Sequence, residues 1–202
     1  MVFEKSKSGF DIEVRYRVVI EGISPLLQHN YLGMHGATTE QETKKVPPPE
    51  REAELGLYRL PDGTLGHPAL GVRKSIIRGS KGYKSGRTRV EELLKSTMMV
   101  VPEDFVVLLR DGKPLKRFDQ VHVTRAVVQR NAVLRARPLF NLPWEVEFGV
   151  VYDGESLADS FLADMMPRII SRAGKVVGIG DWRPETGGLH GRYRLVRYER
   201  VV

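Results

Sequence analysis

The chain has 202 residues, of which 41% are hydrophobic and 28% charged, and this composition is typical of a globular protein with a packed core. It contains no cysteine, so disulfides, thiolate metal sites and cysteine nucleophiles are excluded. No apolar run approaches the ~20 residues that a membrane-spanning helix needs, and the polar first eleven residues do not resemble a signal peptide. We therefore expect one domain over residues 1–202, in the cytoplasm and without a membrane partner.

The net charge of +7 is concentrated in one segment of the chain. From Gly71 to Val90 there is no acidic residue, and the rest of the chain has 25 basic and 25 acidic residues. Such clustering is typical of a phosphate-binding surface, although a solvated basic loop without a polyanionic partner gives the same pattern. The basic residues of this segment are Arg73, Lys74, Arg78, Lys81, Lys84, Arg87 and Arg89.

The first half of the chain predicts a strand, an insertion and a helix. Alternation over residues 12–20 predicts the strand, and Ser24-Pro25 predicts the start of a helix. The pattern then dissolves from residue 32 to 51, so we expect a flexible insertion near residues 32–56. A second helix opens at Pro68 and is broken by glycines, which predicts a flexible basic loop near residues 73–89.

The second half predicts mostly strands, followed by one long helix. A helix begins at Ser156 and is kinked or interrupted at Pro167, and a Gly-rich segment over residues 178–191 precedes the last strand. The resulting order predicts an α+β fold with a ferredoxin-like or RRM-like antiparallel sheet core and inserted loops. The strands are expected at residues 99–101, 105–109, 121–128, 133–139, 144–152 and 193–202.

Three segments of the chain form an ordered pattern. The first is a strand that runs into a Ser-Pro-Leu turn, over residues 18–27. The second is the helix start Gly66-His67-Pro68-Ala69-Leu70-Gly71-Val72-Arg73-Lys74, and the third is the Gly-rich loop before the last strand. In this order, the three segments resemble the RAMP superfamily, the RRM-fold backbone subunits of CRISPR effector complexes and their relatives. The end of the chain also resembles small phage-encoded proteins of unassigned function.

The resemblance implies an RRM-like fold and copies that assemble side by side on a single strand, or a subunit of a larger nucleoprotein complex. Strand-cleaving members of the superfamily have an Asp in the loop after the first strand, where this chain has Gln28-His29-Asn30. The resemblance therefore implies backbone binding without metal-assisted cleavage.

The basic segment, together with Tyr83 in its loop, is the first candidate for nucleic-acid contacts. Two further groups of residues are also candidates. Arg135 and Arg137 share one side of a predicted strand and can follow a phosphate backbone or form ion pairs on an outer face. In the Gly-rich segment, Trp182 can stack on a base or fill the core, and the glycines can form a nest of N–H groups for an anion. Arg183 and Arg192 lie in the same segment.

The five histidines have no metal-ligand spacing, and the sequence predicts neither a metal nor a cofactor. His29 is a weak candidate for a general base. The leading hypothesis is a non-catalytic protein that binds single-stranded RNA or DNA, in a CRISPR or a phage setting. The alternatives are a metal-independent endoribonuclease of the RAMP superfamily and a phage assembly protein whose basic loop contacts DNA or an acidic partner.

Overall fold

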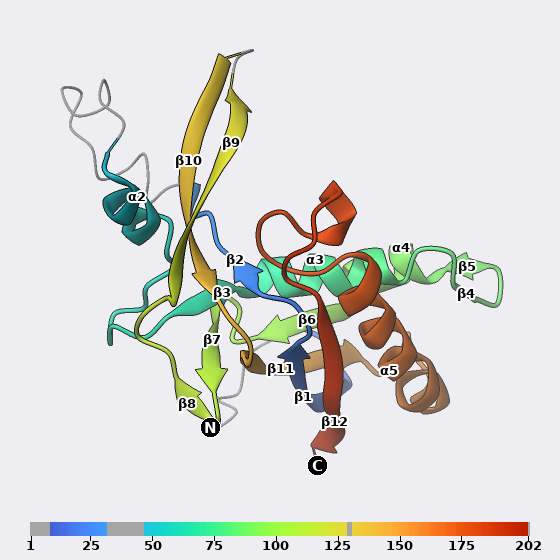
Figure 1. Ribbon diagram of the computed structural model, residues 1–202. Coiled ribbons are helices and arrows are strands. Elements are labelled where there is room, and N and C mark those ends of the chain that lie inside the picture. Colours follow the sequence, from blue (N-terminus) through green and yellow to red (C-terminus); the bar gives the residue numbers. More distant parts are fainter. Residues whose placement is uncertain (1–8, 32–46, 129–130, 202) are drawn as a thin grey trace.

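The computed structural model describes residues 9–31, 47–128 and 131–201, and its centre is an antiparallel β-sheet with helices packed on one face (Figure 1). β1 (Glu13–Gly22) lies between β11 (Glu145–Asp153) and β12 (Tyr193–Val201). Beyond β11 the sheet continues with β6 (Met98–Val101) and β7 (Phe105–Arg110), both paired to β11. Two short strands, β3 (Gly66–Pro68) and β8 (Lys113–Pro114), pair with β7.

Two helices complete a ferredoxin-like arrangement. The chain runs from β1 through α3 (Ala69–Gly79) to β6 and β7, and from β11 through α5 (Asp159–Val176) to β12. The spatial order of the strands is β12, β1, β11 and then β6 with β7, and every pairing is antiparallel. This is the βαββαβ order that the sequence predicts, so the α+β fold with a ferredoxin-like sheet is confirmed.

The core lies between the sheet and the two helices. Period-two alternation in β1 and β11 directs one set of side chains, such as Val18 and Phe148, against α3 and α5. The two helices approach closely at Gly79, where an added Cβ would lie 2.4 Å from the Cβ of Ala173. Trp144 is fully buried, and its indole N–H donates a hydrogen bond of 2.8 Å to the Ser24 carbonyl.

The open face of the sheet carries several ion pairs. Arg17 pairs with Glu147 at 2.7 Å, and Arg194 pairs with Glu21 at 2.6 Å. The aromatic side chains of β1 and β11, Tyr16, Phe148 and Tyr152, lie in the core on the other face. The paired charges lie at the centre of this face, and in β7 Phe105 alternates with the buried Val106 and is 38% exposed, so the sheet also carries one accessible aromatic ring.

A long hairpin projects from the sheet body (Figure 1). It consists of β9 (Gln120–Val128) and β10 (Asn131–Phe140), and β10 also pairs with the short strand β2 (Leu26–Leu27). Helix α2 (Pro49–Leu55) packs against β10 through Glu52, which is 2% exposed and accepts hydrogen bonds from the Ala136 N–H and from Arg135. This buried carboxylate fixes α2 at the base of the hairpin.

Several local predictions are wrong. The Ser24-Pro25 segment leads into β2 and not into a helix, because its backbone is held by pairing with β10. α5 begins at Asp159, since the Ser156 hydroxyl bonds to the Asp153 carboxylate instead of capping a helix. α5 also runs past Pro167 without interruption, with buried residues on both sides of it.

The glycine-broken basic segment is more ordered than predicted. α3 ends at Gly79, and the chain continues through a small hairpin of β4 (Lys84–Ser85) and β5 (Thr88–Arg89) into α4 (Val90–Thr97). Of the expected insertion, residues 32–46 lie outside the described residues and α2 occupies its last part. None of the described helices combines the length and the apolar character needed to cross a membrane.

Candidate nucleic-acid interface

The Gly-rich loop between α5 and β12 is fastened to β2 by backbone hydrogen bonds. The N–H groups of Gly191 and Asp181 donate to the carbonyls of Pro25 and Leu27, at 2.8 and 2.9 Å. Within the loop, the Ile179 N–H donates to the Gly191 carbonyl. The loop includes the short 3₁₀ helix η2 (Pro184–Thr186). These three N–H groups are already bonded within the protein, so they are not available to bind an anion.

Trp182 lies on the outer side of this loop. Its side chain is 43% exposed, so it does not fill the core. Its φ is +50°, a left-handed conformation that is uncommon for a residue other than glycine. The surrounding loop holds it there, because the Trp182 carbonyl accepts a hydrogen bond of 3.0 Å from the His190 N–H. Strained conformations of this kind persist where the neighbouring structure fixes them, and they concentrate at functional sites.

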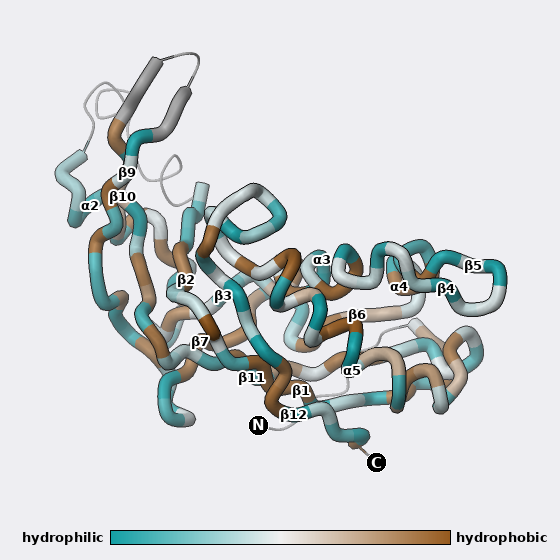
Figure 2. Tube along the Cα trace, turned by 45° about the vertical axis from the view of Figure 1, so that its right-hand side comes forward, coloured by the Kyte–Doolittle hydropathy of each residue, from teal (hydrophilic) through white to brown (hydrophobic). Residues whose placement is uncertain are grey.

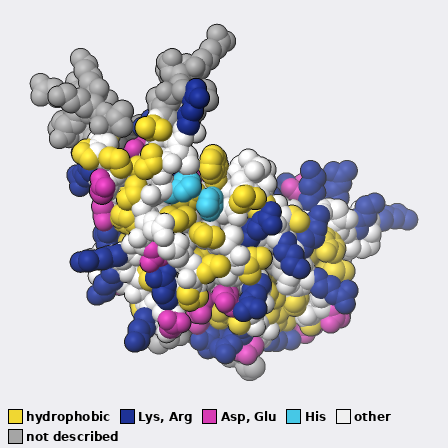
Figure 3. Space-filling view, viewed as in Figure 1, with side chains coloured by type: hydrophobic (Ala, Val, Ile, Leu, Met, Phe, Trp, Pro, Cys, Tyr) yellow, Lys and Arg dark blue, Asp and Glu magenta, His cyan; other side chains and the backbone are white. Residues whose placement is uncertain are grey.

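Two histidine rings lie next to the indole of Trp182. His190 lies nearly parallel to Trp182, with an angle of 7° between the planes and 6.4 Å between the ring centroids. His122, from β9, meets both rings edge-on, at 6.0 Å from Trp182 and 5.3 Å from His190. We call these three residues the aromatic cluster. Figure 3 shows histidine side chains side by side at the base of the hairpin, on the face turned to the reader.

Both imidazoles of the aromatic cluster favour the neutral form. Burial lowers the pKa of His122, and the positive charge of Arg137 lowers it further. Burial also lowers the pKa of His190, with a smaller contribution from His122. Near pH 7 the cluster therefore presents uncharged rings, and such rings can stack on bases of any sequence.

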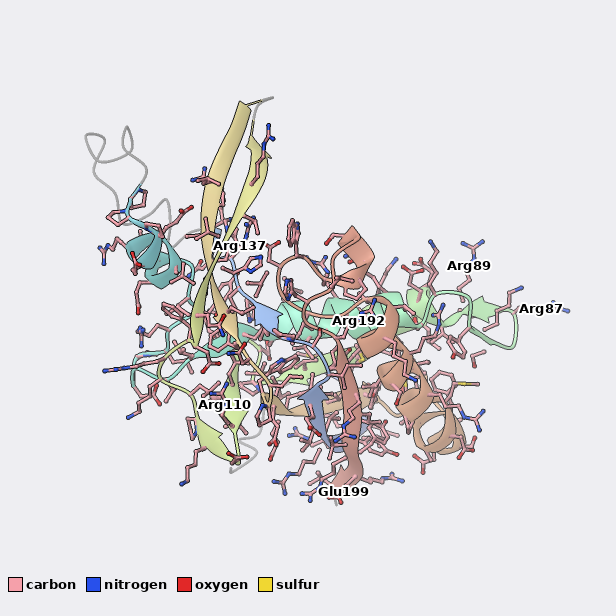
Figure 4. The ribbon with its side chains drawn as sticks, viewed as in Figure 1. Arg87, Arg89, Arg110, Arg137, Arg192 and Glu199 are labelled. Carbon is pink, nitrogen blue, oxygen red and sulfur yellow. The ribbon has the colours of Figure 1, made fainter. Side chains whose placement is uncertain are left out.

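The two arginines of β10 form ion pairs at the base of the hairpin. Arg137 pairs with Asp181 of the Gly-rich loop, and Arg135 pairs with Glu52 at 3.3 Å. Figure 4 shows Arg137 at the point where the hairpin meets the body of the protein. Both arginines thus form ion pairs, which is one of the two alternatives that the sequence left open for them. Arg192, between the Gly-rich loop and β12, has a buried Nε without a hydrogen-bond partner among the described residues.

The basic hairpin, Lys81 to Arg89, forms the opposite end of this face. Lys81, Lys84, Arg87 and Arg89 are all exposed. Figure 2 shows β4 and β5 at a hydrophilic tip, and in Figure 4 Arg87 and Arg89 point outward, far from Arg137. The basic hairpin and the aromatic cluster are therefore two separate patches on the surface of the molecule.

Two residues of the predicted basic surface have structural contacts instead. Arg73 donates hydrogen bonds to the carbonyls of Met98 and Lys95, at 2.9 and 2.5 Å, and so holds the end of α4. The ring of Tyr83 lies under the guanidinium of Arg172, which is 5.6 Å from the ring centroid. Arg172 also donates to the carbonyls of Gly79 and Lys81. This arginine positions the basic hairpin, and the sequence analysis missed it.

A pocket of about 300 Å³ lies between α3, the Gly-rich loop and the segment after β2. Its walls include His29, Tyr58 and His67, which come from three different segments of the chain. The Tyr58 hydroxyl donates a hydrogen bond of 3.0 Å to the His29 carbonyl. The Nδ1 atoms of both histidines are buried without a hydrogen-bond partner among the described residues. Of these three, only His29 was a sequence candidate.

Both histidines of the pocket are held in the neutral form. His67 is 4% exposed, and burial lowers its pKa to about 4, with a smaller contribution from Arg183. Burial also lowers the pKa of His29, and the negative charge of Asp181 opposes this shift in part. The pocket thus offers neutral imidazoles at physiological pH.

The rim of the pocket is strongly charged. Lys74 is exposed and lines it together with Arg78, Arg183 and Glu185. Glu185 lies between the two arginines: its Oε2 accepts from Arg78 at 2.5 Å and from Arg183 at 2.8 and 3.1 Å. The structure therefore brings together two sequence candidates, Arg78 and Arg183, that are 105 positions apart in the numbering of the chain.

No protein-family model matches the chain, and a search of the curated proteins finds no similar sequence.

Proposed function

We propose that this protein binds single-stranded nucleic acid without cleaving it, and that it is a RAMP-type subunit whose copies assemble side by side on the strand. The observation that carries the proposal is the exposed Trp182, held at positive φ and accompanied by two neutral histidine rings. A double helix has its bases stacked inside, whereas the exposed bases of a single strand can stack on protein aromatic rings. An open aromatic cluster on a basic protein therefore favours a single strand.

The charge distribution supports a path for the phosphate backbone. Lys and Arg side chains are spread across the face between the aromatic cluster and the tip that carries β4 and β5 (Figure 3). At that tip Lys84, Arg87 and Arg89 are exposed. The open face of the sheet is a weaker candidate, because its arginines already have carboxylate partners. We therefore place the strand on the loop side of the molecule.

The test is a binding titration with fluorescein-labelled 20-nucleotide RNA and DNA oligomers, single-stranded and double-stranded, at several salt concentrations. We expect single strands to bind more tightly than duplexes and the affinity to fall as salt rises, because each phosphate contact releases counterions. Equal affinity for duplex and single strand would contradict the proposed role of the aromatic cluster. Native mass spectrometry with oligomers of increasing length tests whether several copies bind to one strand.

A second candidate function is a metal-independent endoribonuclease, and the pocket is the observation that favours it. His29, Tyr58 and Lys74 all line the pocket, so a base, a hydroxyl and a cation lie around one space. Cleavage of a labelled RNA in excess EDTA, abolished by His29→Ala and retained by Glu199→Gln, would establish this function in place of the non-catalytic one. We expect the RNA to remain intact.

A further inference from the structure

The pocket beside α3 has the size of a site for one small ligand. Its volume of about 300 Å³ lies at the lower end of the range for small-molecule sites, which is roughly 300–1000 Å³. It opens between the Gly-rich loop and α3, on the elements that also hold Trp182 and the basic hairpin. The pocket is therefore large enough for one small ligand, and a single nucleotide of a bound strand is such a ligand.

At the rim of this pocket, two arginines bind an anionic side chain of the protein itself, the carboxylate of Glu185. Three N–H donors, one from Arg78 and two from Arg183, converge on a single oxygen of Glu185. Arginine forks bind carboxylates and phosphates with the same geometry. Glu185 is the middle residue of η2, which is exposed and contains no buried residue. The carboxylate can thus leave its two partners without opening the core.

The walls of the pocket suit a nucleobase better than a bare anion. His67 and His29 are neutral, so their rings can donate or accept a hydrogen bond, and both have a buried Nδ1 without a described partner. Tyr58 adds an aromatic side chain to the same wall. Buried polar atoms without partners are rare in folded proteins, and a ligand is one way to satisfy them.

We propose that this pocket binds one nucleotide of the strand, with its base against His67 and His29 and its phosphate between Arg78 and Arg183 in place of the Glu185 carboxylate. The inference rests on the proposed function, since it makes the nucleotide part of the bound strand. In the free protein Glu185 competes with the phosphate. Removal of its charge therefore strengthens binding, whereas removal of either arginine weakens it.

The experiment is calorimetric titration of the full chain with each of the four ribonucleoside 5′-monophosphates, with the nucleosides, and with inorganic phosphate. The variants are Glu185→Gln, Arg78→Ala and, as a matched control, Glu199→Gln. Glu199 pairs with Arg197 on β12, and Figure 4 shows it at the end of the molecule away from Arg192. The thermal unfolding midpoint of each variant checks that it folds.

We expect at least one nucleotide to bind, Glu185→Gln to tighten it roughly tenfold and Arg78→Ala to weaken it by a similar factor. Glu199→Gln should leave the affinity unchanged. Phosphate alone should bind more weakly than the nucleotide, because it makes no contact with the walls. Two results would overturn the proposal: an equal effect of Glu185→Gln and Glu199→Gln, or phosphate that binds as tightly as every nucleotide.

Oligonucleotide binding is measured in parallel, so that a failure of the pocket proposal can be distinguished from a failure of the proposed strand-binding function. If labelled oligomers bind to the wild-type protein but no mononucleotide does, the pocket is not a nucleotide site and the proposed function stands. If a mononucleotide binds with the expected Glu185 dependence but oligomers do not, the pocket is a nucleotide site and the strand-binding function is wrong.

Discussion

Trp182 and His190 lie with their rings 7° from parallel and their ring centroids 6.4 Å apart. The backbones of the same two residues are joined by a hydrogen bond from the His190 N–H to the Trp182 carbonyl. The hydrogen bond couples the orientation of the indole to the Gly-rich loop. The aromatic cluster is therefore formed before any ligand arrives, and little ordering is needed when a base stacks on it.

Replacement of Trp182 by Ala should weaken binding of a single-stranded oligomer by ~1–3 kcal/mol, the usual contribution of one base–aromatic stack. The melting temperature should change little, because the indole is 43% exposed. Fluorescence gives a second measurement, since a stacked base quenches an accessible indole. Trp144 is fully buried and should not be quenched, so Trp182→Phe is the control in which the signal change disappears. A large loss of stability with unchanged affinity would show that Trp182 is structural.

Removal of positive charge from the basic hairpin should weaken binding of every sequence alike. The variant Lys84→Ala with Arg87→Ala removes two exposed charges from the tip. The slope of log affinity against log salt should become shallower by ~0.7 for each lost phosphate contact. The matched control is Lys113→Ala with Arg117→Ala, two exposed charges around β8, which Figure 1 places at the other end of the molecule. Equal slopes for both variants would exclude the basic hairpin from the interface.

Stability should fall as the pH is lowered from about 6.5 to about 4. The pKa of His67 is lowered by burial to about 4, while in the unfolded chain it has its ordinary value near 6.5. In this window the unfolded chain binds the proton and the folded chain does not, so the free energy of unfolding decreases by about 3 kcal/mol as the pH drops. Urea unfolding at about pH 7 and about pH 4.5 measures the decrease.

The variant His67→Gln should remove a large part of this pH dependence, because Gln does not titrate. His29, His122 and His190, whose pKa values are also lowered, account for the rest. His122→Gln is the control: its pKa is also lowered, but the side chain is less buried, so it should account for a smaller part. An unchanged pH dependence in His67→Gln would mean that another group causes the loss of stability.

The order of elements was predictable because it depends on local periodicity. Alternation in residues 12–20 and 144–152 and the four-residue spacing after Ser156 are each visible in a single segment, and they predict the central strands and α5. β2 was missed because two residues have no periodicity, and they become a strand only by pairing with β10. The Ser24-Pro25 pattern that suggested a helix is equally compatible with a bend.

The candidate site was predictable only in part, because its geometry depends on contacts between distant segments. The exposed basic residues of the hairpin and Trp182 are distinguished by residue type alone. Nothing local shows that Arg137 pairs with Asp181, or that Glu185 lies between Arg78 and Arg183. The pocket histidines His29 and His67 were also separate features in the sequence, and the wall they share forms only when β2 and β3 fold against α3.

The shape of the Gly-rich loop should depend on some of its glycines much more than on others. Gly187 and Gly191 have similar positive φ values, +82° and +66°. A Cβ at Gly187 would have no atom within 4 Å, whereas a Cβ at Gly191 would lie 1.7 Å from the Ile179 carbonyl oxygen. Gly187→Ala should therefore cost only the left-handed strain of about 1–2 kcal/mol. Gly191→Ala should cost a further ~1–3 kcal/mol, because the clash must be relieved.

The same pair of variants separates loop geometry from loop stability. If the aromatic cluster binds the strand, Gly191→Ala should also reduce affinity under conditions where the protein remains folded, because the shift at Ile179 moves His190 away from Trp182. Gly187→Ala should bind as the wild-type protein does. Chemical denaturation gives the two stabilities, and a titration with the labelled 20-nucleotide strand gives the affinities. Equal affinities for a folded Gly191→Ala and the wild type would show that the strand does not depend on the arrangement of this loop.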